Sequence, residues 1–232
     1  MGSTRRRFYL IAITLAFMSP SVLSAQAQPA PPAPQPRFVV VLDAAHGGDD
    51  SGGSLSNGQL EKTFTLALSV RLRSLLAARS IQVVTTRESD ATVEPDKRAE
   101  IANHAQAQAC LSLHASDTGL GVHLFASSLS PAQSIRFTAW KTAQAAWVTR
   151  SLALEGVLNS ALQHAGMNVT LGRTSLPVLD SMTCPAVAIE IAPEMGPDKK
   201  VAAGLDDPDY QARVAEALAA ALVEWRSEAH QP

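Results

Sequence analysis

Two histidines stand directly after apolar runs whose pattern is typical of buried strands. His46 follows the run Phe38–Asp43, and His114 follows the run Ala109–Leu113. In open α/β sheets, ligands bind beyond the carboxyl ends of the strands, where parallel neighbours end at one edge. We therefore expect both imidazoles at the same edge of a sheet.

Two glutamates could join these histidines. Glu190 interrupts the otherwise apolar run Ala186–Ile191, and a carboxylate inside a buried strand is costly unless it is paired or associated with a metal. Glu61 begins a segment with helical spacing, after a glycine-rich loop that can fold it back toward the strand ends.

This inventory fits one kind of chemistry. Two histidines, one carboxylate and an open position form the ligand set of hydrolytic zinc sites. Water bound in such sites is a nucleophile near neutral pH, and a further carboxylate takes its proton and passes it to the leaving amine. His46, Glu61, His114 and Glu190 fit this scheme, although their scattered spacing alone is weak evidence.

Three of these residues also have structural interpretations. His46 could be a loop histidine, and His114 a strand-end histidine whose hydrogen bonds are satisfied. Glu61 could be a carboxylate that the helix dipole favours in a first turn. The residues alone leave both interpretations open.

The acidic residues near the strands have alternatives as well. Glu190 could form a salt bridge with Arg87 or Lys62, and Glu194 is a weaker candidate for the base. Asp43 could orient a ligand histidine or cap a turn at the end of its strand.

The elements that must position these residues alternate between strand and helix patterns. Further strands are expected over Ile81–Thr86 and Val122–Ser127, and helices over Leu60–Ala78, from Pro95 to about Ala107, from Thr142 to Gly166 and over Tyr210–Trp225. This alternation predicts a single α/β domain, a mainly parallel twisted sheet covered by helices on both faces.

Several short motifs, in order, resemble the zinc-dependent N-acetylmuramoyl-L-alanine amidases of type 3, the kind that split bacterial daughter cells. The matching segments are Asp43–Gly48, Glu61–Lys62, Thr86–Arg87, Arg98, Ala102–Asn103, Ser112–Ser116, Gly121–Ser127 and Pro185–Glu190. The resemblance runs from about Phe38 to Glu224. Ala44-Ala45 and Ser116 depart from the family pattern, as does the segment after Glu190, which bears on substrate fit more than on the chemistry.

The resemblance implies one Zn²⁺ held by His46, Glu61 and His114, with Glu190 as the catalytic carboxylate. It also implies hydrolysis of the amide between N-acetylmuramic acid and L-alanine in peptidoglycan, which releases stem peptides during cell wall remodelling and cell division. The alternatives are a non-catalytic peptidoglycan-binding protein and a zinc peptidase of the cell wall. A degenerate binder has no reason to keep this residue set, and a peptidase acting on a terminal carboxylate needs a cation that no obvious motif supplies.

The N-terminus predicts export. Residues 1–27 are expected to be a signal peptide, with the basic Arg5–Arg7 before the apolar Phe8–Met18. The arginines fit either the twin-arginine or the general secretory route. Residues 28–37, half of them proline, are expected to be a stiff linker, and 38–232 the catalytic domain. The expected location is the periplasm.

The charge composition argues against nucleic acid as a binding partner. The formal net charge is −2, and removal of the signal leaves 16 basic and 21 acidic residues, so the basic footprint of nucleic-acid binders is missing. We expect a monomer that binds peptidoglycan. The sequence leaves open whether a protein activator is needed, and segment 128–141 is short for an autoinhibitory helix, so we expect an accessible zinc site.

The two cysteines allow two interpretations. Cys110 and Cys184 each precede a candidate site residue by a few positions, so they could be neighbours across a parallel sheet. An exported protein permits a disulfide between them. The alternative is two small buried residues.

Overall fold

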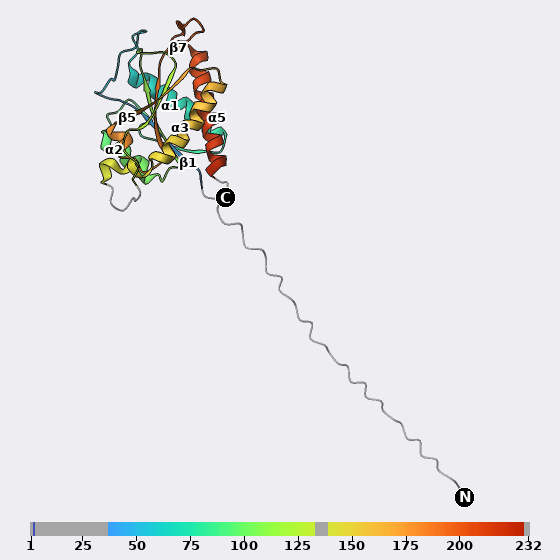
Figure 1. The fold of residues 1–232 in the computed structure, drawn as a ribbon. Helices are drawn as coiled ribbons and strands as arrows, with labels where there is room; N and C mark the ends of the chain where they lie inside the picture. The colour runs from blue at the N-terminus through green and yellow to red at the C-terminus, as the bar shows by residue number, and fades with distance from the viewer. Residues whose placement is uncertain (1, 3–36, 133–138, 230–232) are drawn as a thin grey trace. The chain divides into compact units, whose positions relative to one another are not determined.

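The central element of the protein is a six-stranded sheet (Figure 1). The computed structural model describes Gly2 and residues 37–132 and 139–229, so nearly all of the expected signal peptide and linker lies outside the described residues. The strands are β1 Val39–Ala44, β2 Gln82–Thr85, β3 Ala109–Ala115, β4 Val122–Ser127, β5 Val169–Thr174 and β6 Ala186–Ile191. Their order is β2-β1-β3-β6-β4-β5, and only β4 and β6 pair antiparallel, which confirms the mainly parallel sheet.

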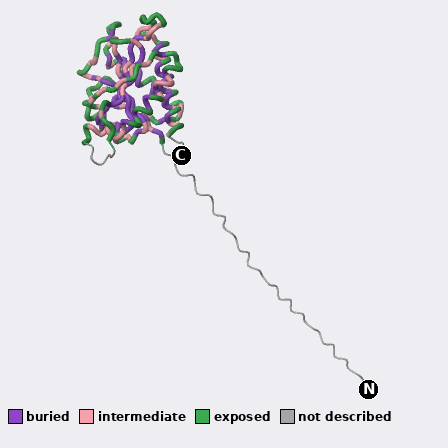
Figure 2. Tube along the Cα trace, viewed as in Figure 1, coloured by how far each residue is buried: buried purple, intermediate pink, exposed green. Residues whose placement is uncertain are grey.

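Helices cover both faces of this sheet, as the alternation predicted. On one face lie α1 Glu61–Ala78, α3 Val148–His164 and α5 Pro208–Ala229, and on the other lie α2 Pro95–His104, the four-residue α4 Pro177–Asp180 and the 3₁₀ helix η2 Trp140–Ala146. The buried residues follow this layering, and the exposed residues lie mostly at the periphery of the domain (Figure 2). No helix in the described part of the chain is long and apolar enough to cross a membrane.

Strand alternation sorts side chains between two cores. Leu111 and Leu113 of β3 belong to the larger core under α1, α3 and α5, whereas Cys110 belongs to the smaller core under α2 and α4. Because successive side chains point to opposite faces, Ser112 and His114 share the face of Cys110. The candidate residues of β3 therefore lie on the face that has the smaller cover.

The helix expected from Thr142 begins later than the sequence predicted. Residues 142–147 do not belong to that helix, since α3 begins at Val148 and Thr142 has a non-helical backbone inside η2. The fully buried Gln144 donates to the carbonyl oxygens of Met182 and Cys184 at 2.9 and 3.0 Å. These bonds to a distant segment hold the chain away from an α-helical path. Gly166, at φ 82°, follows the helix end as expected.

The sequence patterns did not predict several short elements. The edge strand β5 has Gly172 in its middle and consists of exposed and half-buried residues, so it lacks a strong apolar run. The helix α4 has four residues, and the strands β7 Glu194–Met195 and β8 Val201–Ala203 form a small two-stranded sheet.

The two cysteines form a disulfide. Cys110 at the start of β3 and Cys184 just before β6 have Cα atoms 6.3 Å apart and lie 74 residues apart in the chain. The bond joins neighbouring parallel strands at the edge opposite the candidate site residues. A cross-link that closes so long a loop restricts the unfolded chain strongly.

We expect the variant Cys110→Ser/Cys184→Ser to lose about 2–4 kcal/mol of unfolding free energy, because its unfolded state is no longer cross-linked. Guanidinium unfolding of the oxidised wild type and of the variant measures this loss. Reductant should lower the midpoint of the wild type and leave that of the variant unchanged. Equal midpoints for both oxidised proteins would contradict the structure.

A second stability prediction concerns Glu155 on α3. Its side chain is buried, its Oε1 atom has no hydrogen-bond partner among the described residues, and burial raises the pKa of its carboxyl. A raised folded-state pKa means that stability falls as pH rises from the unfolded value of about 4.3 through the folded one.

Glu155→Gln should therefore raise the unfolding free energy at pH 7 and have little effect near pH 4. The exposed Glu228→Gln on α5 is the control and should show no such pH dependence. Urea unfolding at both pH values is the measurement, and a stabilisation equal at both would refute the explanation.

Candidate metal centre

A tight loop after β1 places His46 at the edge of the sheet. His46 has φ 62°, in the left-handed region that is uncommon for residues other than glycine. The carbonyl oxygen of His46 accepts a hydrogen bond from Arg98 at 2.5 Å, and Gly47 and Asp50 exchange backbone hydrogen bonds of 2.8 and 3.2 Å. These contacts hold the histidine in a backbone conformation that it would not adopt freely.

The loop then returns the chain so that Glu61 reaches the same edge. The amide of Gly53 donates to Glu61 Oε2 at 2.9 Å, and the amide of Ala115 donates to Oε1 at 3.2 Å. Gly52 packs closely beneath, since a Cβ atom there would lie 2.6 Å from His46 Cδ2 and 2.7 Å from Glu61 Oε2. Glycine at 52 is therefore required for the two side chains to meet.

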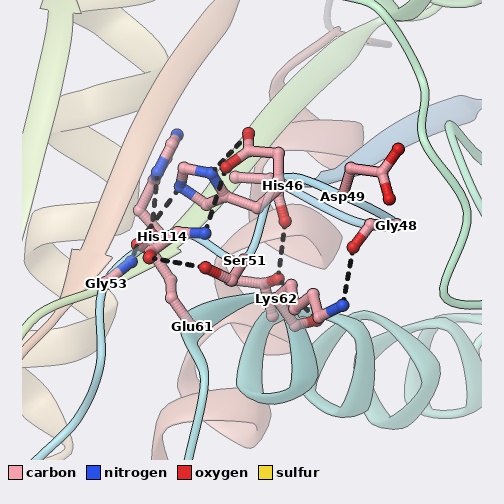
Figure 3. A network of polar contacts seen from close by, with 12 residues as sticks. His46, Gly48, Asp49, Ser51, Gly53, Glu61, Lys62 and His114 are labelled. Carbon is pink, nitrogen blue, oxygen red and sulfur yellow. Dashed lines mark hydrogen bonds and ion pairs between the residues drawn. The ribbon is translucent and has the colours of Figure 1, made fainter.

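Three of the expected ligand residues converge at this point (Figure 3). Glu61 Oε2 lies 3.1 Å from His46 Nε2, and Glu61 Oε1 lies 3.1 Å from His114 Nδ1. One donor atom from each side chain falls within 4.8 Å of the others. The Glu61 side chain is 9% exposed and the two imidazoles are 23% and 25% exposed, so the cluster is accessible from one side.

The charge state of the cluster suits a cation. Burial disfavours a charge on Glu61, but hydrogen bonds from His114 and His46 outweigh it and hold the pKa of the carboxyl well below its usual range. The hydrogen bond with Glu61 raises the pKa of His46 despite burial, so a metal ion bound here would displace a proton from this imidazole. One carboxylate between two imidazole nitrogens is a donor set that Zn²⁺ prefers, so the residues present fit this ion.

Asp50 is a site residue that the sequence analysis missed. Its Oδ2 atom lies 2.8 Å from His46 Nδ1, which leaves Nε2 directed at Glu61. The bond with His46 lowers the pKa of Asp50. Metal-binding histidines commonly donate their second ring nitrogen to a carboxylate. An acidic residue four positions after His46 in a glycine loop was the available signal.

Glu190 lies beside His114 on the neighbouring strand. The two residues are register partners in the parallel pair β3–β6, and both line one cavity. The suggested salt bridge partners are engaged elsewhere, since Lys62 binds Asp90 and a loop carbonyl, and Arg87 binds backbone carbonyls. Glu194 pairs with an arginine of α5, outside the cavities at this edge.

Asp43 has a mainly structural role, as a buried hydrogen-bond acceptor for three neighbouring side chains. Its carboxylate is 1% exposed and contacts Thr86, Arg98 and Ser112 at 2.7, 2.9 and 2.8 Å. Ser112 Oγ in turn lies 3.4 Å from His114 Nε2. Asp43 therefore reaches a candidate ligand through a serine and not directly.

The mainly parallel sheet and the cluster at its edge define an α/β protein with a candidate metal-binding group, and comparison with known proteins assigns the family. The chain belongs to the family described as N-acetylmuramoyl-L-alanine amidase, whose model matches residues 40–224. The resemblance inferred from the motifs is thereby confirmed.

Comparisons with individual proteins agree with this family assignment. An N-acetylmuramoyl-L-alanine amidase of Mycobacterium tuberculosis is 28% identical over 208 residues, covering 78% of this chain and 83% of that protein. A germination-specific amidase of Bacillus subtilis is 32% identical over 90 residues, which span 33% of this chain and 38% of that relative. The catalytic domain of the amidase CwlV from Bacillus (Paenibacillus) polymyxa matches 82% of this chain and 98% of its own length, with 27% identity and a TM-score of 0.64.

The geometry predicts that Asp50→Asn weakens zinc binding about 10–100-fold, because His46 loses the carboxylate that orients its ring. Competition with a chromogenic chelator at fixed pH measures the affinity. Asp49→Asn, a change of the neighbouring exposed carboxylate, is the matched control and should bind like the wild type. Equal affinities for both variants would show that Asp50 does not support the site.

Proposed function

We propose that the protein is a zinc-dependent N-acetylmuramoyl-L-alanine amidase that cleaves the amide between N-acetylmuramic acid and L-alanine and releases stem peptides from peptidoglycan. The observation that carries the proposal is the cluster of His46, Glu61 and His114 with Glu190 on the adjacent strand. Family membership supports the same reaction.

The three clustered side chains would hold the zinc ion, which supplies polarisation of the substrate carbonyl and activation of water when bound. Glu190 accepts the proton of the attacking water on a carboxylate oxygen and then donates it to the nitrogen of the departing L-alanine. The position of Glu190 next to His114, and outside the cluster, suits a proton carrier that is not a ligand.

The other two functions fit the site less well. A peptidase acting at a terminal carboxylate needs a free cation, and Arg98 is the only lysine or arginine among the described residues that line the cavities at this edge. Its guanidinium is occupied by Asp43 and by backbone carbonyls. A binding protein has no use for a carboxylate placed beside a metal cluster.

We further propose that the enzyme works after export to the periplasm, as a monomer with an accessible site. The disulfide is compatible with an oxidising compartment. The described parts of segment 128–141 do not line either cavity at the edge, while residues 133–138 lie outside the described part of the chain.

The test is mass spectrometry of purified peptidoglycan treated with the chain from Gln28, with zinc or with chelator. We expect stem peptides that begin with L-alanine, released only with zinc. Glu190→Gln should lower their rate of release about 10²–10⁴-fold and keep zinc affinity, because it removes the proton carrier and no ligand.

Glu224→Gln near the end of α5, away from the cavities, is the matched control and should cleave like the wild type. Products cut within the stem peptide would show that the protein is a peptidase and not an amidase. Bound zinc without any products would favour the binding protein.

A further inference from the structure

The edge of the sheet has two hollows that share His114 and Leu176. The α2 hollow lies between the loop after β1 and the start of α2, and its lining includes Asp50, Thr92 and Glu94. The β4 hollow is lined by Phe125, Thr174, Ala188 and Glu190 in addition to the two shared residues. Their volumes are about 190 and 180 Å³, below the ~300–1,000 Å³ of whole small-molecule sites. Each hollow therefore suits one part of a larger substrate.

The position of the proton carrier distinguishes the two hollows. Glu190 lines the β4 hollow and not the α2 hollow. A group that protonates the leaving amine must lie within about 2.6–3.2 Å of its nitrogen, directly or through one water. The amine belongs to the peptide, so the peptide side of the scissile bond must extend toward the β4 hollow.

We propose that the β4 hollow receives the L-alanyl end of the stem peptide and that the α2 hollow receives the muramoyl side. This orientation rests on the proposed amidase function. The bond that breaks joins the lactyl carbonyl carbon to the alanine nitrogen. Water supplies the oxygen of the new carboxylate, and its proton passes through Glu190 to the amine.

The walls of the β4 hollow explain how it would recognise a small first residue. The Phe125 ring stacks with His123, with centroids 6.4 Å apart and planes 17° from parallel. Gly172 is the register partner of Phe125 on β5, and a Cβ atom there would lie 2.8 Å from the ring. Ala188 is its register partner on β6. The ring thus lies against a glycine and shares the lining of the hollow with a small alanine, which leaves a space that a methyl group can enter.

The α2 hollow offers a different surface. Glu94 is exposed at the N-cap of α2, and its side chain makes no capping hydrogen bond there. Asp50 and Thr92 add polar atoms, and carboxylate and hydroxyl oxygens accept hydrogen bonds from sugar hydroxyls and from an acetamido N–H. The two ends of the substrate should therefore be recognised independently.

The experiment compares two selectivity ratios in kcat/KM with the zinc-loaded enzyme. The first is muramoyl-L-Ala-peptide over muramoyl-L-Val-peptide. The second is muramoyl-L-Ala-peptide over lactoyl-L-Ala-peptide, which lacks the sugar ring. Phe125→Ala should lower the first ratio at least about 10-fold, because one or two carbon atoms in an apolar pocket discriminate by that order. It should leave the second ratio unchanged.

Glu94→Ala should do the reverse and lower the second ratio alone. Gly172→Ala tests the β4 hollow independently of Phe125 truncation, because it displaces the ring and should favour a first-residue glycine over L-alanine. Leu171→Ala, an exposed change on the same strand β5, is the matched control and should leave both ratios unchanged.

The opposite pattern, with Phe125→Ala changing the sugar ratio and Glu94→Ala the first-residue ratio, would overturn the orientation. Unchanged ratios in Phe125→Ala, Gly172→Ala and Glu94→Ala would overturn it as well. A wild-type enzyme that cleaves none of the three substrates would instead contradict the proposed function. Thermal unfolding and zinc content of each variant identify any that fail to fold.

Discussion

The buried carboxylate of Asp43 is the contact on which the edge of the sheet depends. It accepts hydrogen bonds from Thr86 beyond β2, Ser112 of β3 and Arg98 of α2. One group therefore joins three neighbouring strand ends to a helix. Removal of one partner of a buried charge pair costs about 3–5 kcal/mol, since the other charge is left without compensation. Arg98 also holds the carbonyl of His46, so the same network sets the backbone of the first candidate ligand.

The metal cluster depends on close approach as much as on charge. Glu61 meets two imidazoles, and the glycine loop after β1 allows the backbone to pass close to Glu61 and His46. Burial opposes a charge on Glu61, but hydrogen bonds from His114 and His46, with smaller contributions from the amides at 53 and 115, keep the carboxylate charged. The cluster is thus preorganised by backbone groups, and Asp50 completes it by orienting His46.

Strand alternation connects the core to the chemistry. Leu111 and Leu113 bury one face of β3 under three long helices, which forces Ser112 and His114 to the other face. There the short helices α2 and α4 pack on the smaller core, and the register of β3 with β6 brings Glu190 beside His114. The imidazoles of His46 and His114 remain 23% and 25% exposed, so a polymer such as peptidoglycan can reach the edge.

The sequence by itself determined the class of fold and most element positions, because apolar periodicity and turn residues are local properties, and it singled out three side chains that the structure brings together. The strands over 122–127 and 186–191 lie where their patterns predicted. Only the tertiary structure decided the strand order with its one antiparallel neighbour, the bond between Cys110 and Cys184, and the late start of α3. Contacts between distant segments also decided the weak edge strand β5. These features depend on which residues meet across the fold, and no local pattern records that.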